Sequence, residues 1–137
     1  MVLVFFIPLL LSSGGNSGSQ SATLITRGLA VGEVKMADFR RIFARETLMG
    51  LALGLPLGLA GVGCALYWDT PIAITMVVGL TLACVVTVGA IIGSLLPLGF
   101  KRLGVDPALA SAPFVASLVD VVGVVAYMLI AKAILKL

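Results

Sequence analysis

The residue best placed to do chemistry is Asp120, which lies near the middle of the apolar run from Pro113 to Ile130. The run is long enough to cross a bilayer as a helix, which takes about 20 residues. An ionised carboxylate at that depth costs about 3 kcal/mol on insertion scales, so it must face protein, a wet cavity or a cation. This position predicts an ion pathway. The alternative is a protonated aspartic acid that hydrogen-bonds a neighbouring helix and serves only to hold the bundle together.

A second polar pattern lies near the N-terminus, in a segment that begins with apolar residues. If Val2 to about Val31 forms one helix, its polar side chains are spaced by three or four residues and share one face. These side chains are Ser13, Asn16, Gln20, Thr23 and Arg27. The opposite face is apolar and includes Ala22, Ile25 and Leu29. We expect one long helix with a break near Gly14 and Gly15. Because its polar face cannot contact lipid, that face must line a cavity or pack against protein.

Two further apolar segments and the Asp120 run complete the expected fold. The second span covers Thr47 to Trp68, and the third covers Ile72 to about Phe100. The pair Asp106-Pro107 is typical of a helix start, so the last helix is expected to begin there and to bend at Pro113. The predicted fold class is therefore all-α: a polytopic membrane bundle with about four spans.

A charged segment, Glu33 to Glu46, separates the first two spans. Asp38 is expected to begin a short helix with phenylalanine and isoleucine on one side and arginines on the other, which suits the level of the lipid headgroups. A DNA-binding arm is the competing interpretation, and the short length and apolar flanks disfavour it.

Small residues mark the expected helix contacts. Glycines recur every fourth residue in the second span, and a spaced pair occurs in the third, which allows helix backbones to approach closely. The glycines are Gly50, Gly54, Gly58, Gly89 and Gly93.

Composition excludes several classes of function. The chain is 61% hydrophobic and 11% charged, it has no histidine, and its two cysteines, Cys64 and Cys84, lie in apolar runs. Histidine-based catalysis and a Cys/His zinc site are therefore ruled out. With one buried acid, a membrane enzyme is disfavoured, and the net charge of +3 is too small to indicate nucleic-acid binding.

The basic residues predict the orientation. The first loop and its flanks carry Arg27, Lys35, Arg40, Arg41 and Arg45, and the third loop carries Lys101 and Arg102. The second loop, Asp69 to Pro71, has no lysine or arginine, so the first and third loops are expected on the cytoplasmic side of the cell membrane, with both termini outside. Lys132 and Lys136 near the outer end are tolerable because long side chains reach the interface.

Three segments together resemble the membrane domain of the MgtE magnesium channels, which are related to the solute carrier 41 transporters. They read PLLLSSGGNSGSQSATLITRGLA, then RRIFARE, then LLPLGFKRLGVDPALASAPFVASLVDVVGVVAY. The resemblance extends over nearly the whole chain, in order and with similar spacing. The resemblance implies a homodimer in the lipid bilayer, with the pore on its two-fold axis. Residues 1–137 would then form the ion-conducting domain; the family's first membrane helix and its N-terminal and CBS cytosolic domains have no counterpart in this sequence.

The resemblance also assigns roles to residues. It implies that Asp120 binds a hydrated magnesium ion, Mg²⁺, and that the backbone carbonyl of Ala116 faces the same ion. The pore is lined by the helices that contain Asn16 and Asp120, and the expected lining residues are Ser13, Asn16, Gln20, Thr23, Ala112, Ser117 and Gly123.

These residues leave three functions open. The first is a magnesium channel, with Mn²⁺ or Co²⁺ as alternative cargo. The second is a carrier that couples divalent transport to another cation. The third is a non-conducting assembly subunit that uses its small-residue faces to bind partner helices.

Overall fold

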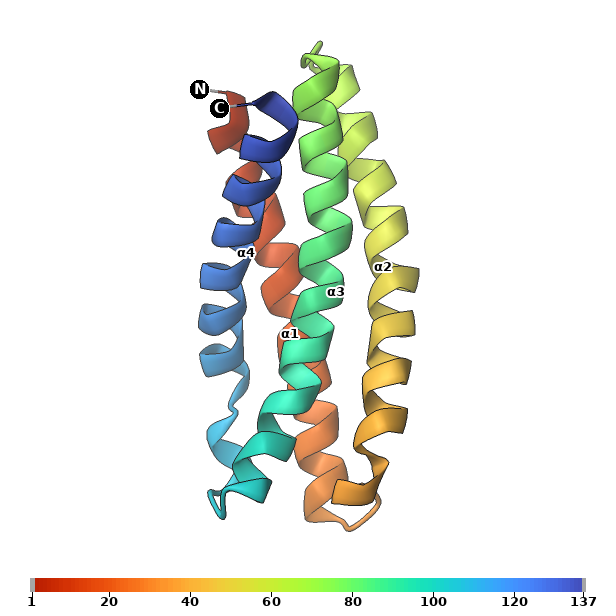
Figure 1. Ribbon diagram of the computed structural model, residues 1–137, viewed down its shortest axis with the longest axis vertical. Coiled ribbons are helices and arrows are strands. Elements are labelled where there is room, and N and C mark those ends of the chain that lie inside the picture. Colours follow the sequence, from red (N-terminus) through yellow and green to blue (C-terminus); the bar gives the residue numbers. More distant parts are fainter. Residues whose placement is uncertain (1, 137) are drawn as a thin grey trace.

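The computed structural model describes residues 2–136 and is an antiparallel bundle of four long helices (Figure 1). The chain descends through α1 and rises through α2, then descends through α3 and rises through α4, so both ends of the described chain lie at the same end of the bundle. The helices are α1 (Ile7–Ala30), α2 (Phe39–Tyr67), α3 (Ile72–Arg102) and α4 (Ala112–Leu135). Short 3-10 helices are η1 (Val2–Phe6), η2 (Met36–Asp38) and η3 (Pro107–Leu109).

The predicted all-helical class is confirmed. Three helices are long and apolar enough to cross a membrane: α2 with the η2 turn before it, α3, and α4. The middle of α1 carries serine, glycine, asparagine and glutamine, which lowers its hydropathy although it lies alongside the other three (Figure 1).

Helix α3 is the centre of the bundle and packs against each of the other three helices. On one side, Gly50, Gly54 and Gly58 of α2 bring the two backbones together, and a Cβ atom at Gly54 would lie 2.7 Å from the Ala83 carbonyl oxygen. On another side, Gly89 and Gly93 meet the backbone of α1. Glycine is required at these positions because any side chain would collide with a neighbouring backbone.

Two details of the N-terminal half differ from the sequence-based expectation. Helix α1 runs through Gly14 and Gly15 without the expected break, because both glycines are buried against neighbouring helices that support the backbone. The separate interfacial helix expected in the Glu33 to Glu46 segment is also wrong. Only Met36–Asp38 forms a short turn, and from Phe39 onward the residues are the first turns of α2.

The start of the last helix was also placed too early. Asp106 caps the short η3 turn, where its Oδ1 atom accepts a hydrogen bond from the Ala108 backbone N–H at 2.9 Å. Helix α4 begins only at Ala112, and Pro113 occupies its first turn. A proline there lacks only an N–H that has no helical partner, so it starts the helix instead of bending it.

The close backbone contact between α1 and α3 gives the first prediction. A Cβ atom at Gly89 would lie 2.6 Å from the Gly14 carbonyl oxygen, whereas nothing lies within 4 Å of one at Gly99 in the same helix. Gly89→Ala is expected to lower stability by about 1–3 kcal/mol because the bundle would be overpacked. The matched control, Gly99→Ala, is expected to be neutral or to stabilise, since alanine favours helix by about 1 kcal/mol. Thermal unfolding in detergent measures both, and equal stability of the two variants would contradict the packing.

Candidate functional site

The site begins where α1 and α4 touch at Asp120. The Asp120 side chain is half-buried, and a Cβ atom at Gly15 would lie 3.1 Å from its Oδ1 atom. One turn earlier in α4, the Cβ atom of Ala116 would lie 3.5 Å from the same added atom. The glycine in α1 therefore leaves the room that the carboxylate of α4 occupies.

Next to this contact, α1 presents exposed polar side chains along the bundle surface. Asn16, Gln20 and Thr23 are exposed, whereas Ser13 is half-buried. Together with Ser117 and Asp120 of α4, we call these residues the polar face. Asn16 follows Gly15 directly, so the first exposed side-chain amide of α1 is one residue away from the contact between Gly15 and Asp120. The residues expected opposite them, Ala22, Ile25 and Leu29, are all buried, so the predicted amphipathic helix is confirmed.

Two hydroxyl groups of this surface bond within their own helices. The Thr23 hydroxyl donates to the Ser19 carbonyl oxygen at 2.8 Å, and the Ser117 hydroxyl donates to the Pro113 carbonyl oxygen at 3.0 Å. Each hydroxyl oxygen keeps lone pairs with which to accept a further hydrogen bond, for example from water.

The other two predicted lining residues, Gly123 and Ala112, are less exposed than Asn16 and Gln20. Gly123 is buried, and a Cβ atom there would lie 3.1 Å from Val85 Cγ1 of α3, so this residue belongs to the interior of the bundle and not to the polar face. Ala112 is half-buried at the start of α4, where its carbonyl oxygen accepts a hydrogen bond from Ser19 Oγ at 2.9 Å.

Serines at alternate positions tie α1 to its three neighbours. Ser17 Oγ donates to the Val86 carbonyl oxygen of α3 at 3.0 Å, and Ser19 Oγ donates to Ala112 of α4. Ser21 Oγ donates to Glu46 Oε2 of α2 at 2.6 Å. Successive residues of a helix point about 100° apart, so Ser19 points away from Ser17 and Ser21. Ser17 and Ser21 share a side of the helix, from which they reach α3 and α2, and the polar face occupies the remaining open sector.

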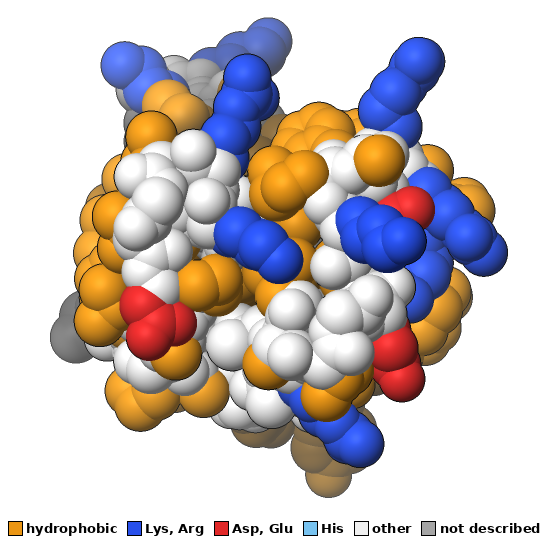
Figure 2. Space-filling model, turned by 90° about the horizontal axis from the view of Figure 1, so that it is seen from below, with side chains coloured by type: hydrophobic (Ala, Val, Ile, Leu, Met, Phe, Trp, Pro, Cys, Tyr) orange, Lys and Arg blue, Asp and Glu red, His pale blue; other side chains and the backbone are white. Residues whose placement is uncertain are grey.

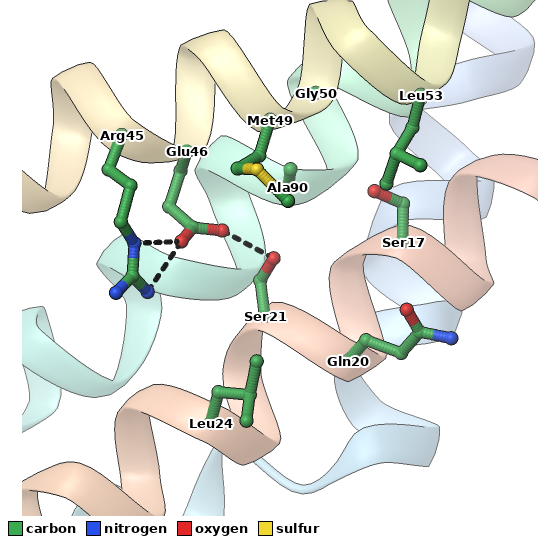
Figure 3. Close-up of a pocket in the computed structure, with 10 residues that line it drawn as sticks. All are labelled: Ser17, Gln20, Ser21, Leu24, Arg45, Glu46, Met49, Gly50, Leu53 and Ala90. Carbon is green, nitrogen blue, oxygen red and sulfur yellow. Dashed lines mark hydrogen bonds and ion pairs between the residues drawn. The ribbon is translucent and has the colours of Figure 1, made fainter.

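Glu46 is a buried acid that sequence reasoning did not single out. The residue is 5% exposed, and its Oε1 atom accepts two hydrogen bonds from the Arg45 guanidinium, at 2.9 and 3.2 Å. This group lies at a pocket of about 330 Å³ between α1 and α2. Ser17 and Gln20 also line the pocket (Figure 3). A signal was present in the sequence, because Glu46 continues the four-residue spacing of Gly50 and Gly54 and so shares their buried face.

The oxygen atoms of the polar face are suited to binding a hydrated cation weakly. Among residues 2–136, no group of three His, Cys, Asp or Glu side chains could hold a metal ion. Asp120 offers one carboxylate, and its neighbours on the polar face offer amide and hydroxyl oxygens. Such a set can accept hydrogen bonds from the water shell of an ion without replacing that shell.

Comparisons with known proteins identify the family of the chain. The family model for MgtE, described as a divalent cation transporter, matches residues 7–130. The chain is 46% identical over 134 residues to the magnesium transporter MgtE of Thermus thermophilus, and 35% identical over 135 residues to that of Enterococcus faecalis. Each alignment covers 98% of this chain but only 30% of the relative.

The third relative, the magnesium transporter MgtE of Bacillus subtilis, is 29% identical over 133 residues, with the same 30% share of its length. The chain thus spans about a third of the length of the curated relatives that it matches. Since the family model covers most of the chain, and three of the helices suit a membrane, this is a membrane protein that belongs to the MgtE family of divalent cation transporters.

Proposed function

We propose that the chain moves hydrated Mg²⁺ across the membrane along the polar face, through a pore between two copies of the chain. The observation that supports this most is the contact of Asp120 with Gly15, which puts a mid-membrane carboxylate beside the exposed amides of α1. The choice of magnesium rests on the names of the relatives, and membership of a transporter family argues against an enzyme.

Magnesium suits these oxygens because it is small and gives up its water reluctantly, so proteins hold it with one or two carboxylates and several waters. Two Asp120 side chains facing each other across a two-fold axis would supply two negative charges. The water shell of the ion would exchange hydrogen bonds with the side chains of Asn16, Gln20 and Ser117. Manganese and cobalt ions carry the same charge and are therefore competitors to include in any uptake assay.

The second copy is proposed because the polar face is open in the single chain. Polar groups in the hydrocarbon core must be covered by protein or water, and a two-fold pair covers the same surface on both subunits. This arrangement also makes α1 a span, which gives four spans in total.

The dimer predicts cross-linking through position 120. In a chain whose Cys64 and Cys84 are replaced by alanine, Asp120→Cys is expected to be joined between subunits in membranes by a short bifunctional thiol reagent. The control is Leu59→Cys, which replaces a side chain that is 72% exposed on α2. Efficient cross-linking at position 59 with none at position 120 would reject a pore on this axis.

The charge distribution supports a cytoplasmic location for the lower end of the bundle. Figure 2 shows lysine and arginine side chains spread around this end, where the α1–α2 and α3–α4 connections lie. The seven basic residues of these connections and their flanks are all exposed, and short cytoplasmic loops carry such an excess.

The orientation predicts which side of the membrane can be labelled. A cysteine at the exposed position 37, in the α1–α2 connection, should react with an impermeant thiol reagent only after the cells are opened. A cysteine at Asp69, in the exposed turn at the other end, is the matched control and should react in intact cells. Labelling of position 37 from outside would contradict the orientation.

The test of the pathway is Asp120→Asn. The side chain hardly changes in size, so packing should be preserved. In a dimer the substitution removes two negative charges from the path, and the barrier for a hydrated divalent ion should rise by several kcal/mol. Magnesium uptake into proteoliposomes is therefore expected to fall at least about 100-fold, as a barrier increase of about 2.7 kcal/mol implies.

Thermal stability is the control for this experiment. The folded Asp120→Asn variant should be as stable as the wild type or more so, because two like charges no longer face each other. Wild-type uptake by the variant would reject the pathway and favour a structural role for Asp120.

A further inference from the structure

The buried carboxylate of Glu46 lies outside the polar face, yet it is bonded to the helix that carries that face. Ser21 is 8% exposed and Glu46 is 5% exposed, and their hydrogen bond joins α1 to α2. Figure 3 shows Ser21 pointing from α1 toward Glu46, with the Arg45 guanidinium on the far side of the carboxylate. Both carboxylate oxygens are thus partnered, which removes most of the cost of burying this charge.

The bond matters most in the middle of α1, where the contacts with α3 and α4 are made by glycines. Toward α3 and α4 the helix presents Gly14, Gly18 and Gly15, which allow close approach but offer no side chain that interlocks with the neighbour. Toward α2 there is a pocket of about 330 Å³. Buried side chains fix α1 on either side of this segment, Leu10 before it and Ile25 after it. Within the segment, directional hydrogen bonds help to set the rotation of the helix. The bond to Glu46 is the strongest of the three serine bonds, because its acceptor is charged and its length is 2.6 Å.

The rotation of α1 about its axis determines which of its side chains are exposed at the polar face. Gln20 precedes Ser21 directly and is exposed between Asn16 and Leu24, so it lies within the open sector of the helix. Turning α1 in either direction moves Gln20 toward α2 or toward α4. The hydrogen bond from Ser21 to Glu46 opposes both movements, since a helix that turned would separate the two groups.

We propose that Glu46 is a positioning residue for transport: through Ser21 it holds α1 in the rotation that directs Asn16 and Gln20 toward the ion path. The inference rests on the proposed function, in which the polar face carries the ion. Glu46 itself does not contact the ion, because its oxygens are occupied by Ser21 and Arg45.

The experiment separates the hydrogen bond from the charge. In a chain with Cys64→Ala, Cys84→Ala and Gln20→Cys, the rate of reaction of position 20 with a small water-soluble thiol reagent reports the rotation of α1. Glu46→Leu and Ser21→Ala are each expected to lower this rate by about threefold or more, which corresponds to about 0.7 kcal/mol. Glu46→Gln keeps an oxygen that accepts from Ser21 and should react like the parent chain. The double variant Ser21→Ala/Glu46→Leu should be no slower than Glu46→Leu, since both act through one bond.

The matched control is Thr47→Ala. Thr47 follows Glu46 in α2, but its hydroxyl donates to the Phe43 carbonyl oxygen of the same helix, so its loss should leave position 20 unchanged. In chains that retain Gln20, Glu46→Leu and Ser21→Ala should also raise the magnesium concentration for half-maximal uptake by about threefold or more, again about 0.7 kcal/mol. A structural loss alone would lower the amount of folded protein without moving this concentration.

The outcomes decide the proposal. Parent-like labelling and parent-like half-saturation in folded Glu46→Leu would overturn it. If that variant does not fold, the same parent-like results in Ser21→Ala, which loses only one hydroxyl, would overturn it. Failure of the proposed function is distinguishable, because it appears as wild-type uptake by Asp120→Asn, whereas labelling of position 20 needs no transport.

Discussion

The bundle depends on the close approach of α3 to the backbones of α1 and α2. Between apolar helices in lipid the hydrophobic effect contributes little, so packing and hydrogen bonds must hold them together. Glycines provide that packing here: Gly54 and Gly58 of α2 meet the carbonyl oxygens of Ala83 and Gly79, and Gly89 of α3 meets that of Gly14. Because α3 contacts all the other helices, these few positions determine where α1, and with it the polar face, can lie.

Different sides of the polar helix α1 make different kinds of contact in this bundle. Glycines face α3 and α4, three serines bond to the three neighbours, and the amides of Asn16 and Gln20 remain exposed. A helix with so many polar groups is a poor membrane span on its own. Its partners satisfy the three serine hydroxyls, and the outward-facing groups need water or protein. The proposed pore between two copies would supply both.

The sequence predicted the helices well because their signals are local. The amphipathic pattern of residues 13–27 and the apolar runs each depend on a few neighbouring positions, and the burial of Ala22, Ile25 and Leu29 follows from the same pattern. The errors came where a local signal has two structural solutions. The pair Asp106-Pro107 is an equally good start for the short η3 turn and for a long helix, and the structure contains the turn.

The surroundings of the candidate site residues were predicted less completely, for a physical reason. The spacing of residues along α4 places Gly123 near Asp120, but only the position of α3 shows that Gly123 is buried against Val85. Likewise, Glu46 was included in the charged segment Glu33 to Glu46, whereas the four-residue spacing with Gly50 places it on the packed face. Which face of a helix meets which neighbour is a property of the whole bundle.

The central claim is that a divalent cation crosses the membrane along the polar face and carries its two positive charges with it. The most direct test measures magnesium uptake by the wild-type chain in dye-loaded proteoliposomes under an imposed membrane potential. An inside-negative potential of 100 mV lowers the free energy of an entering divalent ion by about 4.6 kcal/mol, so uptake should rise steeply as the interior becomes more negative. Uptake no greater than in protein-free vesicles, or uptake that does not respond to the potential, would contradict the account.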